Sequence, residues 1–276
     1  MKTCGFGALC IEPLERRVTK YANKPDNYNY SRNEHHILSL LSPHDHIIKL
    51  CQYFEDPARG PVLVFEYGGT DLFDVQPLVG CNDTICQYIL KQVRSALRFL
   101  HEHRVAHLDV KLENIVVDAL TNVRLIDFGM ATTSPCVHRI CGTNPYVCPE
   151  MWRKWNETNV YTADIWSYGI VAFALYHGFL AWEVANAGDA RFSRVLEKQA
   201  QGALPYASVE SSRASPPWLQ QEMNTTLWVD PRKRRFSDTP LTYSQVVVQA
   251  SSLVVEKGIQ FLDTVYRKKG FECSHV

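Results

Sequence analysis

The feature that most constrains the fold is one short window, "HLDVKLENIVVDALTNVRLIDFG", which covers residues 107–129. Two short apolar runs in this window, "IVV" and "VRLI", are separated by turn-forming residues and predict a β-hairpin. Asp109, Lys111 and Asn114 precede the first run, and Asp127 follows the second. Because a hairpin brings its outer ends together, these polar side chains are predicted to meet at one edge of it.

Such a group of polar side chains requires a cation. Neighbouring carboxylates repel each other and raise each other's pKa unless positive charge occupies the site. The side-chain oxygens of Asp and Asn suit Mg²⁺, a hard ion that commonly completes its coordination shell with the phosphates of a substrate. The apolar runs therefore predict a scaffold, and the polar residues at their ends predict a metal and phosphate site.

The chain divides into two parts with different patterns. The first contains four strand-like runs, "LCIEP", "RRVTKY", "IIKLCQYF" and "PVLVFEY", around one helical segment, "SRNEHHILSLL". From Thr84 onward, helical patterns dominate, and the glycines Gly68 and Gly69 mark the boundary. The predicted fold class is α+β, with a small β-rich lobe containing one main helix in residues 1–67 and a larger, mostly helical lobe in residues 68–276.

The second part contains both amphipathic and apolar helical patterns. The apolar residues of Ile85–Leu100 recur at helical spacing, and Asn82, Asp83 or Thr84 is expected to cap the helix. The stretch Ile165–Trp182 is apolar for about the length of a membrane span. Its Ser, Tyr, Gly and His residues favour a buried central helix instead. Further helical segments are predicted at Asp189–Gln201, Pro217–Trp228 and Thr242–Tyr266.

Charge and cysteine content argue against several classes of protein. The formal net charge of the 276 residues is zero, so the chain has no general attraction to nucleic acid or to an anionic membrane. The nine cysteines are an odd number without a CxxC pair. This usage argues against a disulfide framework or a zinc site and favours a reduced, intracellular setting. The N-terminal stretch "MKTCGFGALC" lacks the apolar run of a signal peptide.

Together, the motifs resemble those of the eukaryotic protein-kinase superfamily, serine/threonine type. "HLDVKLEN" is similar to the catalytic loop HRDxKxxN, "DFG" from Asp127 to the metal-binding motif, and "CPE" from Cys148 to APE. "DIWSYG" resembles DxWSxG, "DPRKR" resembles DPxxR, and "NEHHIL" resembles the helix that carries an ion-pair glutamate. The resemblance covers nearly the whole chain and implies ATP and Mg²⁺ as cofactors. The compact size and divergent motifs of the chain are reminiscent of the kinases of large DNA viruses such as herpesviruses.

The resemblance implies a role for each polar residue of the window. Asp109 is expected to accept the proton of a substrate hydroxyl, and Lys111 is expected to contact the transferred phosphate. Asn114 and Asp127 are expected to hold Mg²⁺. The alternatives are a turn aspartate, a solvated surface lysine, and two residues that merely close the hairpin. His107 is expected to be a buried structural residue.

The small lobe supplies the expected phosphate contacts. Lys20 stands in a strand, and burial of its charge is costly unless it is paired. Glu34 falls within the apolar stripe of the following helix and is its natural partner. The resemblance implies that Lys20 then holds the α- and β-phosphates of ATP, whereas an edge-strand lysine is the alternative. Gly5 and Gly7 resemble the end of a shortened glycine-rich loop and would let backbone N–H groups approach phosphate.

The segment "VFEYGGTDLFD" resembles the hinge that contacts adenine in the same family. Backbone groups of Glu66 and of the region around Gly68 are expected to bond adenine, Phe65 to be the gatekeeper, and Asp71 to reach the ribose. A plain connection from strand to helix is the alternative.

The implied activity is transfer of the γ-phosphoryl group of Mg-ATP to serine or threonine hydroxyls of proteins. Lys111 and the pair Gly142–Thr143 are typical of serine/threonine kinases, and Glu113 favours basic substrates. Leu108 stands where the catalytic loop usually has an arginine that grips a phosphorylated activation segment, so we expect activity without such phosphorylation. The alternative is a pseudokinase that acts as a nucleotide-binding or scaffolding module. The sequence indicates no oligomeric state.

Overall fold

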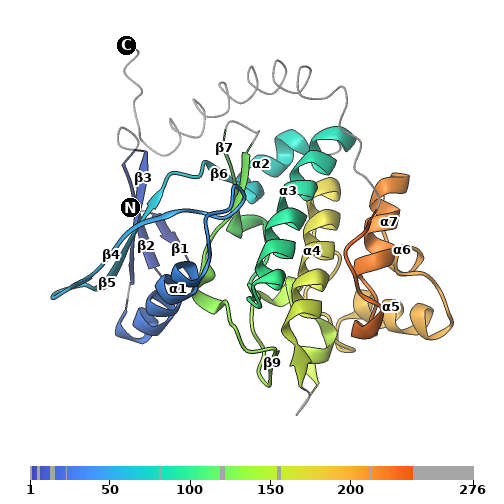
Figure 1. Ribbon diagram of the computed structural model, residues 1–276. Helices are drawn as coiled ribbons and strands as arrows, with labels where there is room; N and C mark the ends of the chain where they lie inside the picture. Colours follow the sequence, from blue (N-terminus) through green and yellow to red (C-terminus); the bar gives the residue numbers. More distant parts are fainter. Residues whose placement is uncertain are drawn as a thin grey trace.

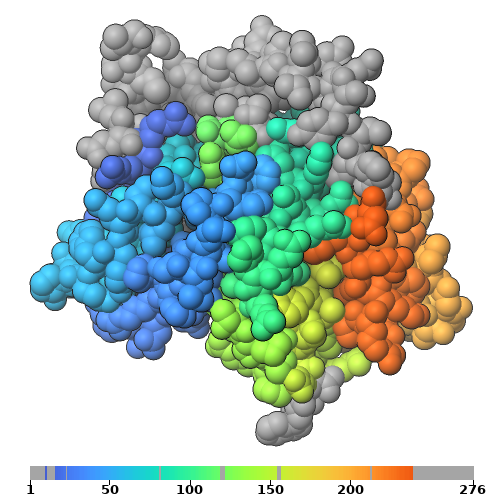
Figure 2. Space-filling model, viewed as in Figure 1, coloured from blue at the N-terminus to red at the C-terminus, as the bar shows by residue number. Residues whose placement is uncertain are grey.

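The computed structural model describes residues 2–4, 7–12, 16–22, 24–80, 82–118, 122–153, 157–211 and 213–238. Within these ranges the chain forms a sheet-rich half and a helical half, which confirms the α+β fold class (Figure 1). Figure 2 shows the blue surface of the sheet-rich half lying directly against the green surface of the helical half. The predicted helix Thr242–Tyr266 and the predicted phosphate-binding residue Gly5 lie outside the described residues.

The sheet-rich half contains an antiparallel sheet with the strand order β1-β2-β3-β5-β4, and helix α1 packs against it. The elements are β1 (Lys2–Cys4), β2 (Gly7–Glu12), β3 (Arg17–Ala22), α1 (Tyr28–Leu40), β4 (Leu50–Asp56) and β5 (Gly60–Glu66). The predicted strand runs are therefore confirmed. The central strand β3 carries Lys20, which pairs with Leu9 on one neighbour and Leu63 on the other.

The helical half begins at a short strand that belongs to a separate three-stranded sheet. Its helices are α2 (Leu72–Val79), α3 (Asp83–Glu102), α4 (Val160–His177), α5 (Ala190–Ala200), α6 (Pro205–Ser208) and α7 (Pro217–Thr226). Its strands are β6 (Thr70–Asp71), β7 (Ile115–Asp118), β8 (Asn122–Leu125), β9 (Cys136–Val137) and β10 (Thr158–Asn159). Strands β7 and β8 form the predicted hairpin, in which Ile115 pairs with Leu125.

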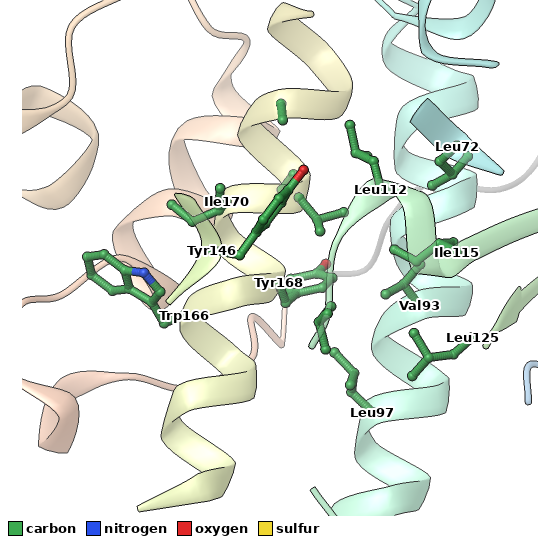
Figure 3. Packing of buried hydrophobic residues seen from close by; sticks show 14 of the residues in the cluster. Leu72, Val93, Leu97, Leu112, Ile115, Leu125, Tyr146, Trp166, Tyr168 and Ile170 are labelled. Carbon is green, nitrogen blue, oxygen red and sulfur yellow. The ribbon is translucent and has the colours of Figure 1, made fainter. Parts of the chain in front are cut away.

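Helices α3 and α4 lie side by side and bury the core of this half (Figure 1). Figure 3 shows side chains of both helices gathered with those of the hairpin into one cluster, including Val93, Leu97, Tyr168, Ile170, Ile115 and Leu125. All of these side chains are buried. The amphipathic stripe that predicts α3 is thus its core face, and Asn82 caps the helix by accepting hydrogen bonds from the main-chain N–H groups of Thr84 and Ile85.

Helix α4 is buried on nearly every side, which confirms the predicted central helix. Asn159 caps its start, and Gly178 ends it with a left-handed φ of 79°. Across the described part of the chain, no helix combines the length and the apolar character that crossing a bilayer requires.

The connection between the halves is held against the hairpin. Strand β6 pairs with β7, and a Cβ atom at Gly69, where φ is 107°, would lie only 2.0 Å from the carbonyl oxygen of Val117. Glycine is therefore required at this position. The boundary placed between residues 67 and 68 stays a prediction.

A buried ion pair joins three elements of the helical half. Arg94 of α3 donates a hydrogen bond of 2.9 Å to Glu222 of α7 and one of 2.8 Å to the main-chain oxygen of Ser237. The hydroxyl of Tyr168 in α4 donates to the other oxygen of Glu222 at 3.3 Å. Burial raises the pKa of Glu222 more than Arg94 lowers it, so the carboxylate depends on its partners to remain charged.

Removal of one partner from this buried pair should be far more damaging than removal of a partner from a surface pair. We expect Arg94→Ala to lower the free energy of unfolding by about 3–5 kcal/mol, because Glu222 is left buried and uncompensated. The matched control is Arg194→Ala, since Arg194 pairs with Glu210 while both side chains are more than half exposed, at 55% and 53%. The control should lose less than about 1 kcal/mol. Urea unfolding measures both, and equal losses would contradict the assignment of Arg94 to the stability of the core.

Candidate active site

The hairpin brings the polar residues of the window 107–129 together, as predicted. The main-chain N–H of Ile126, one residue before Asp127, donates to the main-chain oxygen of Asn114 at 2.9 Å. The side-chain amide of Asn114 donates to the main-chain oxygen of Asp109 at 2.9 Å and to its Oδ2 at 3.0 Å. The two ends of the hairpin therefore meet, and they carry one carboxylate each.

Donors fix the carboxylate of Asp109 on both oxygens. Thr143 Oγ1 donates to Asp109 Oδ1 at 2.8 Å, and Lys111 Nζ lies 2.9 Å from Asp109 Oδ2. Lys111 Nζ also donates to Thr143 Oγ1 at 2.8 Å, so the three side chains form a closed ring. Asp109 is only 8% exposed. The sequence indicates Thr143 only as a mark of substrate class, because its contact with Asp109 spans 34 residues of sequence.

An ion triad, buried at Lys20 and Glu34 and partly buried at Asp127, links the sheet, α1 and the hairpin. Lys20 Nζ donates to Glu34 Oε2 and to Asp127 Oδ1, each at 2.8 Å. Lys20 is 5% exposed and Glu34 is 1% exposed. The second oxygen of Glu34 accepts a hydrogen bond of 3.0 Å from the main-chain N–H of Phe128. The predicted pairing of Lys20 with Glu34 is present, and Lys20 is not an edge-strand lysine.

Burial and charge act in opposite directions on this triad. Burial lowers the pKa of Lys20, but Glu34 and Asp127 together raise it well above its ordinary value. Burial also raises the pKa of Asp127, yet the Lys20 ammonium outweighs this effect and holds that pKa below its ordinary value. For Glu34 burial prevails, and its pKa lies above the ordinary value. The arrangement therefore favours an ionised carboxylate at Asp127 and a charged ammonium at Lys20.

The residues predicted to form the hinge lie at the end of β5 and in the connection that follows it. The N–H of Glu66 donates to the main-chain oxygen of Lys49 at 3.1 Å, and its carboxylate pairs with Arg124. Gly68 is buried, and a Cβ atom there would lie 2.6 Å from a side-chain methyl group of Val116, so the site requires glycine. Asp71 caps α2 by accepting a hydrogen bond from the N–H of Asp74 at 2.9 Å. Gly7 is the first residue of β2.

His107 has the structural position expected of it. Its side chain is fully buried, Nε2 lies 2.9 Å from the main-chain oxygen of Ile126, and its main-chain N–H donates to Asp164 Oδ2 at 2.8 Å. Asp164 also accepts from the N–H of Leu108 at 2.8 Å. The carboxylate at the start of α4 thus supports the loop that carries Asp109.

The donor set fits Mg²⁺ bound together with phosphates. Because the Asn114 side chain uses its N–H groups on Asp109, the amide oxygen is the ligand atom that it retains. Asp127 adds carboxylate oxygens with the charged state favoured. Within the described ranges, no group of three or more His, Cys, Asp or Glu side chains could hold a metal by itself. One amide and one carboxylate are the sparse protein ligands that Mg²⁺ uses when phosphates complete its shell.

The triad predicts strong coupling between Lys20 and Glu34. We expect Lys20→Met to destabilise the protein by about 3 kcal/mol or more, because the buried Glu34 and the partly buried Asp127 lose their shared cation. Glu34→Gln in that variant should restore at least half of the loss, since it removes one of the uncompensated charges. A double-mutant cycle in urea measures the coupling free energy. If the losses in free energy of unfolding of the two single variants simply add in the double variant, the two side chains do not interact energetically.

Comparison with known proteins assigns the family. Residues 15–245 match the protein kinase domain. The chain is 36% identical over 160 residues to serine/threonine-protein kinase chk1 of Schizosaccharomyces pombe, covering 54% of this chain and 32% of that protein. It is 32% identical over 192 residues to serine/threonine-protein kinase grp of Drosophila melanogaster, covering 66% and 36%. It is 30% identical over 232 residues to serine/threonine-protein kinase SBK1 of Mus musculus, covering 79% and 54%.

The chain spans about a third to a half of the length of these relatives. The similarity to viral kinases stays a prediction. The kinase-domain match nevertheless covers most of the chain and includes the ring around Asp109 and the ion triad of Lys20. The chain therefore belongs to the eukaryotic protein kinase superfamily, serine/threonine type.

Proposed function

We propose that the protein transfers the γ-phosphoryl group of Mg-ATP to serine and threonine hydroxyls of protein substrates. The observation that carries the proposal is the ring formed by Asp109, Lys111 and Thr143, adjacent through Asn114 to the ion triad at Asp127. A scaffold protein has no physical need to keep a buried lysine, its glutamate partner and a fully hydrogen-bonded aspartate together. The names of the three relatives support the same class of activity.

The nucleotide contacts come from the sheet and the hinge. Lys20, oriented by Glu34, would hold the α- and β-phosphates, and main-chain groups at Glu66 and Gly68 would bond adenine. Asp71, fixed at the start of α2, would contact the ribose. Gly5 and Gly7 would let main-chain N–H groups reach the phosphates without obstruction by Cβ atoms.

Transfer itself relies on orientation by the ring. The carboxylate of Asp109 accepts the proton of the substrate hydroxyl as that oxygen bonds to the γ-phosphorus and the bond to the leaving β-phosphate oxygen breaks. The ammonium of Lys111 offsets negative charge on the transferred group. Asn114 and Asp127 would hold Mg²⁺, which when bound neutralises charge on the phosphates. The Asp164 carboxylate, which accepts hydrogen bonds from the main-chain N–H groups of His107 and Leu108, would keep Asp109 in place during the reaction.

The finer features of substrate and setting are also proposals. Glu113 is exposed within the loop that resembles the catalytic loop and supports a preference for basic residues near the acceptor hydroxyl. We further propose that the protein works inside the cell and requires neither nucleic acid nor a membrane, in line with the net charge of zero.

Transfer of labelled phosphate from ATP to a generic basic protein tests the proposal. Asp109→Asn and Asp127→Ala should each lower the rate by at least about a hundredfold, because the first removes the proton acceptor and the second a metal ligand. Glu210→Gln is the matched control, since Glu210 is more than half exposed and pairs with Arg194 of α5 on the surface of the helical half. Equal rates for wild type and Asp127→Ala would show that the activity belongs to a contaminant.

A pseudokinase is the second candidate function. The replacement of an arginine by Leu108 favours it. In that case wild type would bind a fluorescent ATP analogue in the presence of Mg²⁺ and transfer no phosphate to any substrate offered. The two functions are therefore separated by measuring nucleotide binding and transfer on the same preparation.

Main-chain contacts hold the activation segment, residues 127–150, without an arginine in the catalytic loop. Ala106 and Thr132 exchange two main-chain hydrogen bonds of 2.9 Å each, and β9 pairs with β10 just before α4. Leu108 adopts a φ of 63° and is buried. A Cβ atom at Gly142 would lie 2.6 Å from the carbonyl oxygen of Leu108, so the segment packs directly on this turn.

These contacts predict that phosphorylation of the segment is not needed for activity. Replacing Thr132, Thr133 and Ser134 together with alanine should leave most of the wild-type turnover intact. The hydroxyls of Thr132 and Ser134 make local hydrogen bonds, so a loss of about 1 kcal/mol in stability is expected and is measured separately. Loss of most of the turnover at a temperature where the variant remains folded would contradict the prediction.

A further inference from the structure

The residue before the ion-pair glutamate makes contacts that the proposed chemistry does not explain. The side-chain amide of Asn33 in α1 donates one hydrogen bond of 3.0 Å to the main-chain oxygen of Gly129 and one of 2.8 Å to that of Ala131. These two carbonyls belong to the short 3₁₀ turn that begins directly after Asp127, η3 (Phe128–Met130), and to the residue that follows it. In Figure 1, α1 lies beside the green segment after β8 that contains this turn.

Asn33 and Glu34 bind the same main-chain segment with opposite hydrogen-bonding roles, Asn33 as a donor and Glu34 as an acceptor. Glu34 accepts from the N–H of Phe128 at 3.0 Å, at the start of the turn. Asn33 donates to carbonyls within and after it. The contact is also close sterically, because a Cβ atom at Gly129 would lie 3.4 Å from the Cβ atom of Tyr30. Two adjacent side chains of α1 thus fix both ends of the turn.

The turn needs such restraint because Asp127 has an unfavourable backbone. Its φ of 63° and ψ of 73° lie in the left-handed region, which a residue with a Cβ atom occupies at a cost of about 1–3 kcal/mol unless its surroundings impose it. Movement of the turn would displace Asp127 from Lys20. The turn that Asn33 holds therefore links the position of α1 to the positions of the Lys20 ammonium and the Asp127 carboxylate.

We propose that Asn33 is a positioning residue, which keeps Glu34 and Asp127 in register by donating hydrogen bonds to one carbonyl within the turn and one directly after it. The inference rests on the proposed function for its kinetic consequence. Asparagine is a poorer helix former than alanine in a helix interior, so its presence in α1 is not explained by helix stability. Its amide provides two N–H groups, and both are used.

Two substitutions separate hydrogen-bond donation from shape. Asn33→Ala removes both donors and favours the helix, and Asn33→Asp keeps the shape but has no donor when ionised. We expect both to lower kcat/KM for ATP about tenfold or more, from the loss of two hydrogen bonds that orient the site. The effect should fall mainly on kcat, with a smaller rise in KM for ATP, because the phosphate-binding groups remain. Asn29→Ala, an exposed position on the same helix, is the matched control and should leave both constants unchanged.

A readout that does not depend on activity tests the contact itself. Hydrogen–deuterium exchange of the peptide covering residues 126–134 should be faster in Asn33→Ala than in Asn29→Ala, whereas exchange in α7 should be the same in both. If wild type transfers no phosphate but this exchange difference is present, the proposed function fails and the positioning role stands. Unchanged exchange together with unchanged kcat/KM would overturn the role of Asn33.

The double variant with Glu34→Gln distinguishes positioning from general destabilisation. Because Asn33 and Glu34 hold one turn, the loss of kcat/KM in Asn33→Ala/Glu34→Gln should be clearly smaller than the product of the two single losses. If the loss of kcat/KM in the double variant equals the product of the losses in the two single variants, Asn33 acts independently of the turn and the proposal is overturned.

Discussion

The ion triad of Lys20, Glu34 and Asp127 is the interaction on which the arrangement of the two halves depends. Its members come from β3, α1 and the segment after β8, so each element supplies a charge that the others must neutralise. A buried charge without a partner costs several kcal/mol, far more than a surface pair can offset. The sheet, the helix and the hairpin are therefore restricted to relative positions in which the three side chains meet. The same restriction places a positively charged group beside the carboxylate that is proposed to hold Mg²⁺.

The sequence predicts this part of the structure well because its signals are local. Alternating or continuous apolar runs identify the strands, the stripe from Ile85 to Leu100 identifies α3, and Glu34 is conspicuous as an acid within an apolar face. The contacts that the sequence does not reveal are made by polar side chains without periodicity. Arg94 meets Glu222 across 128 residues, and Asn33 meets Gly129 across 96. The sequence around Arg94 or Asn33 does not indicate the partner of either residue, because only the packed fold brings each pair together.

Leu108 illustrates how an altered motif is compatible with an ordered site. An arginine at this position would offer a charge for a phosphate on the activation segment, whereas leucine contributes only burial. The segment is instead held by the paired strands β9 and β10 and by the main-chain exchange between Ala106 and Thr132. Main-chain hydrogen bonds do not depend on a modification, so order in this region is built into the fold. The replacement of the arginine therefore argues for constitutive order at least as strongly as it argues for loss of function.

Orientation, more than acid or base strength, is what the site provides. Asp109 is bound on both carboxylate oxygens by Asn114, Lys111 and Thr143, and this leaves little freedom for the group to rotate. Phosphoryl transfer passes through a loose transition state in which the protein has little covalent chemistry to perform, so alignment of the hydroxyl and compensation of charge carry most of the effect. A hydrogen-bond network that holds one carboxylate in a fixed orientation is suited to aligning the hydroxyl. The grip of α1 on the turn after Asp127 has the same character, because it fixes the direction of a carboxylate and adds no reactive group of its own.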